Sequence, residues 1–273
     1  SLSMPETMAE LLPAPLRFLL RLTAPKPKRS QPVLHQYCTA IPIGAAIAQS
    51  WNTSFAETCG DVVGNEMERM NVDLWLAPGL NLNRNPLCGR NYEYFSEDPY
   101  LSAAVSIAIT KGVQSHPGRG VTIKHLAANN QETLRVSHCS VVDERTMRDL
   151  YMKGFELTVK YAHPWSMMTS LNCVNGPHGT NNKDIASYSA RDEWGFDGVV
   201  MTDWNTTTPA RGASTTGCVN SGNDLIMPGS EEDVAKILKA LKNRSGDGDV
   251  ITLGALQLCA RHVLEILIRT ERI

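Results

Sequence analysis

The sequence predicts an α/β fold built as a TIM-like (β/α) barrel, and three observations favour it. Short apolar strands alternate with amphipathic helices five or six times, which implies a parallel sheet with right-handed crossovers. Polar residues follow the strands at their carboxyl ends, where barrels place their active sites. The alternative, a doubly wound nucleotide-binding sheet, loses its main support because neither GxGxxG nor GxxxxGKS/T occurs.

The composition is that of an ordinary globular protein, with 273 residues, 42% of them hydrophobic and 20% charged. This length suffices for one large domain or two small ones. The net charge of -2 gives no basic surface for nucleic acid or acidic membranes, and no apolar stretch is long enough for a membrane span. Seven scattered cysteines without a CxxC pair argue against a disulfide framework or a zinc site, and they predict a reducing, cytoplasmic location.

Residues 1–30 are expected to be an extension or linker, and residues 31–273 the barrel domain. The first segment has no basic residue before its apolar stretch and contains several prolines, so it lacks the pattern of a signal peptide. Residues 16–22 could form a short amphipathic helix, and residues 24–30 resemble a proline-rich, basic linker.

Beyond the linker, apolar periodicity predicts the elements in order. Helices are expected over 51–70, 99–114, 143–162, 183–194, 231–243 and 252–270. Asn52 or Thr53 can cap the first helix, and Asp143 opens the third with DERT, which resembles a capping box. Short apolar runs predict strands over 72–76, 120–125, 165–171, 198–203 and 223–227.

The polar residues after these strands form the candidate site: Arg84 and Arg90, Lys124 and His125, Asn172, Asp203 with Trp204, and Asp224. Arg90, Lys124 and His125 carry enough donors to hold several sugar hydroxyls, and Trp204 offers an apolar wall for a sugar face. Cationic neighbours would lower the pKa of Asp203 and keep its carboxylate available as a nucleophile or base.

Each of these residues, taken alone, has a plainer interpretation. Asp203 fits a turn cap, and the lysine–histidine pair fits a structural or solvated role. The tryptophan could simply be packed. Arg90 fits a clamp on one of the acids that follow it, Glu93, Glu97 or Asp98. Only the shared position at strand ends favours a catalytic site.

Four stretches, LAPGLNLNRNPLCGRNYEYFSEDPYLS, IKHLAANNQE, DERTMRDLYMKGFE and DEWGFDGVVMTDW, occur in an order that resembles glycoside hydrolase family 3, the β-glucosidases and their relatives. The resemblance runs from about Ala40 to the C-terminus. GVQSHPG, MTDWNTT and NDLIMPGS are similar to the bacterial branch in which the barrel follows the other domain.

The resemblance implies a retaining hydrolase of terminal β-D-glucosyl residues that needs no metal or organic cofactor. It implies that Asp203 is the nucleophile. It also implies that Arg90, Lys124 and His125 grip the sugar in the −1 subsite, with Trp204 lining that subsite.

Three departures from the family pattern stand out. The family's early DGPHG-type aspartate is not found, which leaves open whether the first barrel strand is present. Leu171 stands where the family usually has a tyrosine close to the nucleophile. The general acid/base glutamate of two-domain members lies on a separate α/β sandwich domain, for which this sequence has no room. Losing a general acid typically costs about 10²–10⁴-fold in rate.

Two barrel residues are weighed as a replacement acid/base. Single-domain relatives, the β-N-acetylglucosaminidases, use a histidine on the loop after the KH strand, and His138 lies in about that place. Val136 stands near the position where an orienting aspartate is usual, so the plainer interpretation of His138 is an exposed loop histidine. Glu132 is a second candidate, but it fits better as a residue that orients the backbone or Lys124.

Two functions therefore compete. The first is a retaining β-glucosidase-like hydrolase that works by double displacement through Asp203. The second is a catalytically weak or silent sugar-binding module that depends on a partner, which Leu171 and the missing acid favour. The barrel face left without its sandwich domain also predicts a homo-oligomer or a partner contact.

Overall fold

The computed structural model describes residues 37–243 and 249–271. The chain divides into two compact units, Ser1–Thr39 and Ala40–Ile273, and every element below belongs to the second. The expected extension over 1–30, with its helix over 16–22 and its linker over 24–30, lies outside the described residues. The domain boundary near residue 30 therefore stays a prediction.

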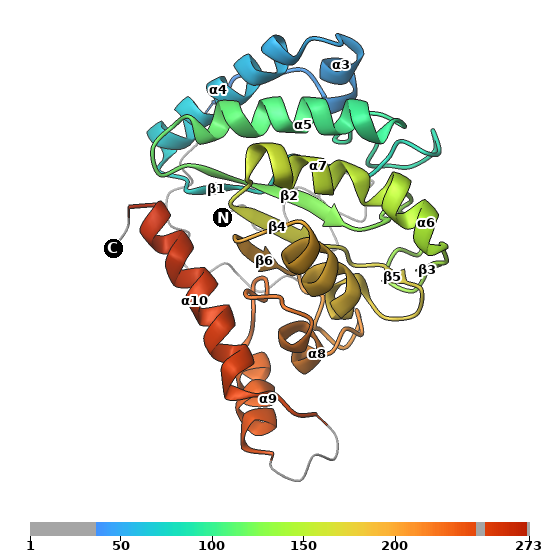
Figure 1. The fold of residues 1–273 in the computed structure, drawn as a ribbon, viewed down its shortest axis with the longest axis vertical. Helices are drawn as coiled ribbons and strands as arrows, with labels where there is room; N and C mark the ends of the chain where they lie inside the picture. Colours follow the sequence, from blue (N-terminus) through green and yellow to red (C-terminus); the bar gives the residue numbers. More distant parts are fainter. Residues whose placement is uncertain (1–36, 244–248, 272–273) are drawn as a thin grey trace, which may run out of the picture. The chain divides into compact units, whose positions relative to one another are not determined.

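A parallel sheet with strand order β1–β2–β4–β6 lies at the centre of the second unit (Figure 1). Its strands are β1 (Leu74–Trp75), β2 (Gly120–Leu126), β4 (Ser166–Thr169) and β6 (Val199–Met201). Thr122 faces Ser166 across β2 and β4, and Ser166 faces Val199 across β4 and β6. Beyond β6, a parallel bridge between Met201 and Leu225 adds a fifth segment. Within the described ranges no further strand joins either edge, so the sheet forms an open arc of a (β/α) barrel.

Three helices, α4 (Thr53–Met70), α5 (Pro99–Gln114) and α7 (Lys153–Ala162), cover one face of this sheet (Figure 1). Helix α5 packs against both α4 and α7, which explains why it buries residues nearly all round. Two glycines allow α4 and α5 to approach closely. A Cβ at Gly60 would lie 2.3 Å from the carbonyl oxygen of Ile109, and one at Gly112 would lie 2.2 Å from that of Glu57.

The remaining elements flank the sheet or form its loops. A second, two-stranded parallel ladder pairs β3 (Cys139–Ser140) with β5 (Cys173–Val174). The other helices are α3 (Gly44–Gln49), α6 (Glu144–Thr146), η1 (Met147–Tyr151), η2 (Gly179–Asn181), η3 (Asp184–Glu193), α8 (Thr215–Asn220), α9 (Glu231–Lys242) and α10 (Leu253–Arg269).

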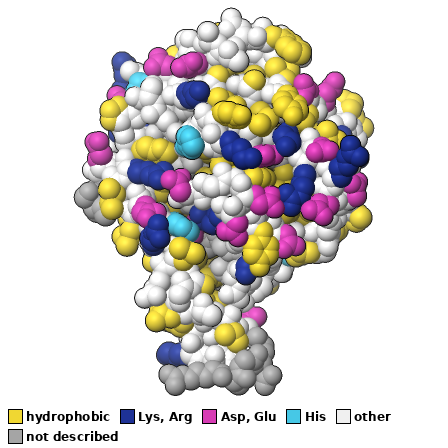
Figure 2. Space-filling view, viewed as in Figure 1, with side chains coloured by type: hydrophobic (Ala, Val, Ile, Leu, Met, Phe, Trp, Pro, Cys, Tyr) yellow, Lys and Arg dark blue, Asp and Glu magenta, His cyan; other side chains and the backbone are white. Residues whose placement is uncertain are grey.

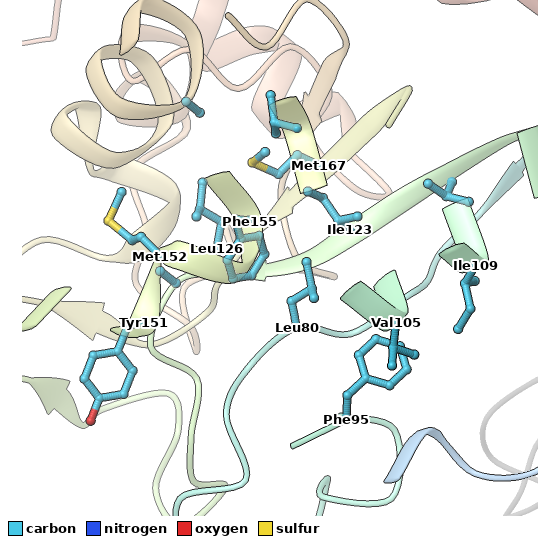
Figure 3. Packing of buried hydrophobic residues seen from close by; sticks show 14 of the residues in the cluster. Leu80, Phe95, Val105, Ile109, Ile123, Leu126, Tyr151, Met152, Phe155 and Met167 are labelled. Carbon is cyan, nitrogen blue, oxygen red and sulfur yellow. The ribbon is translucent and has the colours of Figure 1, made fainter. Parts of the chain in front are cut away.

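The hydrophobic core lies between the sheet and its covering helices. Ile123 and Leu126 of β2 are fully buried, and Phe155 of α7 and Met167 of β4 belong to the same cluster (Figure 3). Tyr151 sits at the edge of the cluster, and its hydroxyl is directed away from the labelled aliphatic residues (Figure 3). This core fixes β2 and so fixes the residues that follow it.

The predicted alternation and the parallel sheet are confirmed. The helix predicted over 99–114 has these bounds, and Asp98 caps it by accepting from the Tyr100 amide at 2.8 Å. Asn52 caps α4 by accepting from the Phe55 amide at 3.0 Å. The strand predicted over 223–227 runs beside β6 but forms a single bridge, at Leu225.

The prediction of one continuous helix over 143–162 is wrong. Asp143 is the N-cap, as expected, and accepts from the Thr146 amide at 3.0 Å. The Met152 amide then donates to the Met147 carbonyl, five residues back, so the chain forms a π-turn before α7 begins. The helix predicted over 183–194 is likewise a π-helix, η3. The helices α3 and α8 and the β3–β5 ladder are too short to show apolar periodicity, and the sequence did not predict them.

None of the helices in the described ranges is long and apolar enough to cross a bilayer. In the same ranges, no group of three histidine, cysteine or acidic side chains is placed to hold a metal ion. Lys, Arg, Asp and Glu side chains intermingle on the face seen in Figure 2, which therefore shows no patch of a single charge sign.

Candidate active site

The candidate active site lies at the carboxyl ends of adjacent strands. Lys124 and His125 lie near the carboxyl end of strand β2, and Asp203 comes two residues after β6. The long loop between β1 and α5 supplies Arg90 and crosses beside β2, because Gly79 bridges Lys124 and the Leu80 amide donates to the Lys124 carbonyl at 2.6 Å. Residues far apart in the sequence are thereby brought to one rim of the sheet.

Glu93 connects the two cations of this cluster. Its carboxylate accepts a short hydrogen bond from Arg90 Nε and lies 3.4 Å from Lys124 Nζ. Burial acts to raise the pKa of Glu93, but the Arg90 hydrogen bond and the Lys124 charge outweigh it and bring the pKa below its usual range. Glu93 is therefore ionised and balances part of the positive charge.

Lys124 lies within electrostatic reach of Asp203. Burial, followed by the charge of Arg90, lowers the pKa of Lys124, while Glu93 and Asp203 act to raise it. The carboxylate of Asp203 and the ammonium of Lys124 thus belong to one electrostatic cluster, although they come from strands separated in the sheet by β4.

His125 is held as a neutral imidazole. Complete burial, reinforced by the charges of Arg90 and Lys124, lowers the pKa of His125 well below its ordinary value. Arg90 Nη2 lies 3.1 Å from Nε2, and because a guanidinium only donates, Nε2 must accept. The proton therefore sits on Nδ1, which donates to the Tyr94 hydroxyl at 3.2 Å.

The backbone of His125 is fixed as firmly as its ring. The Asn81 side chain donates to the His125 carbonyl and accepts from the His125 amide, both at 2.9 Å. Such paired bonds give His125 a single orientation, with Arg90 against one ring nitrogen and Tyr94 against the other.

Asp203 is 7% exposed and is only partly engaged by its own turn. Its Oδ1 accepts from the Trp204 amide at 2.7 Å, and its carbonyl accepts from the Thr206 hydroxyl at 2.5 Å. In the described part of the chain Oδ2 has no hydrogen-bond partner, so the turn-cap interpretation accounts for one carboxylate oxygen only. Trp204 is 46% exposed, as a wall residue of an open site would be.

Glu132 is committed to neighbouring side chains. Its carboxylate accepts from Asn129 at 3.1 Å and from Arg135 at 3.0 Å, and it lies 3.9 Å from Arg90. The same Asn129 amide donates to the Tyr94 hydroxyl at 3.1 Å. Glu132 thus orients the cluster, as its sequence context suggested, through Arg135 and Arg90 rather than through Lys124.

Three strand-end residues lie outside the cluster. Asn172 donates to backbone carbonyls around residues 127–128, and Arg84 donates to the Tyr151 hydroxyl at 2.8 Å. Asp224 is buried between Arg191 and His262, which lie 2.5 and 2.8 Å from its two oxygens. These residues fasten loops and helices.

His138 lies beside a different pocket, with Arg84 and Tyr151 in the lining. Within the described residues, no hydrogen bond or ion pair joins it to Asp203, Arg90 or Lys124. Leu171 is fully buried beyond the end of β4 and brings no hydroxyl to the cluster.

Sequence reasoning missed Glu93, Tyr94, Asn81 and Asn129 as members of the site. Glu93 entered only as one of three possible partners for Arg90. The available signal was the spacing of GRNYEY, which sets an acid and a phenol three and four residues after the arginine. Asn81 and Asn129 leave no such signal, because their partners are 44 and 35 residues away.

The arrangement combines a carboxylate oxygen without a hydrogen-bond partner among the described residues, two cations that share Glu93, a neutral histidine and an exposed indole at the rim of a (β/α) barrel. Such a rim suits the binding of a polyhydroxylated ligand, because its donors and acceptors are fixed before the ligand arrives. The fold and the site thus define a (β/α) barrel with a polar site at the carboxyl ends of its strands.

The model of the Glycosyl hydrolase family 3 N terminal domain matches residues 30–266. The chain belongs to glycosyl hydrolase family 3, and its fold is the TIM-like barrel of that domain. The resemblance read from the sequence motifs is confirmed.

Relatives include the thermostable β-glucosidase B of Acetivibrio thermocellus, which is 41% identical over 206 residues, 75% of this chain and 26% of the relative. An exo-α-(1→6)-L-arabinopyranosidase of Bifidobacterium longum is 40% identical over 233 residues, 85% of this chain and 29% of that protein. The structure of β-glucosidase 3B from Thermotoga neapolitana in complex with glucose matches with a TM-score of 0.80 and 39% identity, over 88% of this chain and 33% of that one. The chain thus spans about a quarter to a third of the length of these proteins.

Proposed function

We propose that this chain carries the nucleophile and the glycone-binding residues of a retaining β-glucosidase-like hydrolase. The observation that carries the proposal is the cluster in which Arg90 and Lys124 share ionised Glu93, neutral His125 contacts Arg90, and Lys124 lies within electrostatic reach of Asp203. Fixed donors of this kind can hold the sugar hydroxyls, and Trp204 can pack against a sugar face.

In the proposed reaction Asp203 Oδ2 attacks C1 of a terminal β-D-glucosyl unit. The bond from C1 to the leaving oxygen breaks, that oxygen takes a proton, and a covalent glycosyl-enzyme forms. Water then attacks C1, loses a proton to a base, and releases the sugar and the Asp203 carboxylate. Each step inverts the configuration at C1, so the two steps together retain it.

The proton in the first step would come from outside this cluster. Glu93 and Glu132 are held as ion-pair partners, and His138 belongs to another pocket. We therefore propose no acid/base within this cluster and expect turnover of substrates whose leaving group needs protonation to be slower by about 10²–10⁴-fold.

The substrate proposal follows the names of the relatives. Two of them are a β-glucosidase and an exo-α-(1→6)-L-arabinopyranosidase, so β-D-glucosyl and α-L-arabinopyranosyl units are the two glycones to compare. We favour the glucosyl unit, because the solved relative from Thermotoga neapolitana is described as a complex with glucose.

The competing function is a sugar-binding or partner-dependent barrel with little activity of its own. Fully buried Leu171 favours it, because this side chain supplies no phenol near the nucleophile. In that case the partner would complete the site and supply the acid.

The test is covalent labelling with 2,4-dinitrophenyl 2-deoxy-2-fluoro-β-glucoside, read by intact mass. This leaving group departs without a proton, so a missing acid does not affect the result. Asp203→Asn is the test variant. Asp192→Asn is the matched control, because Asp192 is an exposed residue of η3 outside the cluster.

We expect one fluoroglucosyl unit on the unmodified chain and on the Asp192 variant, and none on the Asp203 variant. Long incubation without any label would contradict the hydrolase proposal and favour the partner-dependent module. Label on the Asp203 variant would assign the nucleophile elsewhere.

We further propose a homo-oligomer or a partner at the barrel rim. Leu87, Leu134 and Val141 support it, because they are 90, 74 and 85% exposed on loops that follow β1, β2 and β3. The cytoplasmic location inferred from the cysteines stays a prediction.

A further inference from the structure

A polar pocket of 710 Å³ lies beside the candidate active site, and the proposed function makes no use of it. Ala128, Asn130 and Gln131 line the pocket, while the adjacent Asn129 and Glu132 contact the active-site cluster. The loop after β1, strand β3 and Tyr151 of η1 form the other walls. This volume lies within the range of small-molecule sites in proteins.

Arg84 gives the pocket its charge. Its Nη1 donates a hydrogen bond to the Tyr151 hydroxyl at 2.8 Å, and the guanidinium lies 6.0 Å from the centre of the same ring. In the described part of the chain Arg84 forms no ion pair. None of the described lining residues is aspartate or glutamate, so the positive charge of Arg84 is not balanced within the pocket.

Two lining side chains have unused hydrogen-bonding groups. Asn130 is 8% exposed, and although its Nδ2 donates to the Leu82 carbonyl at 2.8 Å, its Oδ1 has no partner among the described residues. Both ring nitrogens of His138 are buried and equally without a partner in the described ranges. Buried polar atoms without partners are costly, so a water molecule or a ligand atom that reaches them would be stabilised there.

These groups differ in kind from those of the active-site cluster. There, Arg90 and Lys124 share the Glu93 carboxylate, and the carboxylate of Asp203 adds a second negative charge, which leaves little net charge for an anion. In the pocket, a guanidinium and an imidazole can both donate to an oxyanion, whereas Asn130 Oδ1 requires a donor such as a hydroxyl.

We infer that this pocket binds a hydroxylated anion, such as a sugar acid or a sugar phosphate. Arg84 and His138 donate to its carboxylate or phosphate oxygens, and one of its hydroxyls donates to Asn130 Oδ1. The pocket would thus hold either an acidic unit next to the sugar at Asp203 or a separate anionic metabolite. This inference stands on the pocket alone and does not depend on hydrolysis at Asp203.

Isothermal titration calorimetry of the full chain tests it, with glucuronate and glucose 6-phosphate as the two anionic probes. We expect at least one of them to bind, and Arg84→Gln to weaken that binding by at least about tenfold, since it removes the charge from a charge-assisted hydrogen bond. Tighter binding of glucuronate would assign a carboxylate, and tighter binding of glucose 6-phosphate would assign a phosphate. Arg145→Gln, on the exposed face of α6, should bind as the unmodified chain does.

A second pair of variants keeps the inference testable if Arg84→Gln disturbs the folding of the chain. Val141 is 85% exposed at the pocket, so Val141→Asp adds a negative charge with little risk to folding, and Val141→Asn adds the same shape without charge. We expect the aspartate to weaken binding of the anion and the asparagine to leave it within about twofold. Failure of both probes to bind, or equal affinities of the Arg84→Gln and Arg145→Gln variants, would overturn the inference.

Discussion

Glu93 stabilises the positive charges of Arg90 and Lys124, although the proposed chemistry assigns it no bond to the sugar. It balances Arg90 and Lys124, and by its own charge it raises the pKa of Lys124 against the effect of burial. A half-buried acid between two cations therefore opposes the fall in the pKa of Lys124 that burial causes, and it holds Arg90 in place.

Glu93→Gln should slow labelling by the fluoroglucoside by at least about tenfold, because the two cations lose an ionised partner. The loss should grow toward alkaline pH. Without Glu93 the pKa of Lys124 falls further, so the ammonium loses its proton at a lower pH than in the unmodified chain. Labelling rates between pH 6 and pH 9 measure this.

Glu97→Gln is the matched control for that substitution, because Glu97 is an exposed acid four residues further along the same loop. Labelling of the control should follow the unmodified chain at every pH. Equal rates for the Glu93 variant and the control would show that Glu93 has no influence on the site.

At the scale of elements, the contact between α4 and α5 depends on two glycines. Gly112→Ala would place its Cβ 2.2 Å from the Glu57 carbonyl oxygen, a backbone atom of α4 that cannot turn aside. We expect a loss of about 1–3 kcal/mol in the free energy of unfolding, measured by urea denaturation.

Gly254→Ala in α10 is the corresponding control, since its added Cβ would meet no atom within 4 Å. Because alanine favours helix over glycine, this change should be neutral or stabilise by up to about 1 kcal/mol. A Gly112 variant as stable as the Gly254 variant would show that the two helices can separate without cost.

His116 joins α4 to the turn after α5. Its ring nitrogens lie 3.0 Å from Asp61 and 3.0 Å from Glu68, and both partners belong to α4. Burial acts to lower the pKa of His116, but the hydrogen bonds and charges of Glu68 and Asp61 outweigh it and raise the pKa above 6.5. Protonated His116 therefore binds α4 more strongly than the neutral form.

A raised pKa in the folded state means that this stabilisation is complete below the unfolded pKa of His116 and is lost as the pH rises through the folded value. His116→Gln should cost up to about 1 kcal/mol near pH 5.5 and less near pH 8.5, because the carboxylates are 62 and 40% exposed. Urea denaturation at the two pH values measures the difference. A His116 effect that is larger at pH 8.5 than at pH 5.5 would contradict the assignment.

At the scale of the whole molecule, the exposed leucines of the rim predict association. The molar mass from light scattering should exceed that of one chain at concentrations of tens of micromolar, and the double variant Leu87→Ser with Leu134→Ser should shift it toward one chain. A molar mass of one chain at all concentrations, for both proteins, would count against an interface at this rim.

How far the sequence could predict the fold and site depends on how local each signal is. The bounds of α5 follow from Asp98, Pro99 and continuous apolar spacing, all within one segment. The apolar runs before Lys124 and His125 and before Asp203 correctly predicted that these three residues lie at the ends of strands. The π-turn at Met147–Tyr151 could not be predicted, because apolar spacing does not distinguish a five-residue from a four-residue hydrogen bond.

The separation of His138 and Arg84 from the cluster was equally beyond sequence reasoning. Both lie close in sequence to site residues, yet the β3–β5 ladder holds His138 against Cys173, whose amide donates to the His138 carbonyl at 3.2 Å. Pairings between residues about 35 positions apart decide which wall a side chain faces, and one sequence does not reveal them.

The burial of Asp224 between Arg191 and His262 also has a consequence for partial unfolding of the molecule. His262 belongs to α10, and Arg191 belongs to η3, so one carboxylate ties the last helix to the outer segment of the sheet. If this tie opens, α10 can detach as a cooperative unit and leave the Leu225 segment uncovered. An uncovered strand edge is a template for intermolecular pairing, so we expect hydrogen exchange in α10 to precede turbidity when the protein is heated.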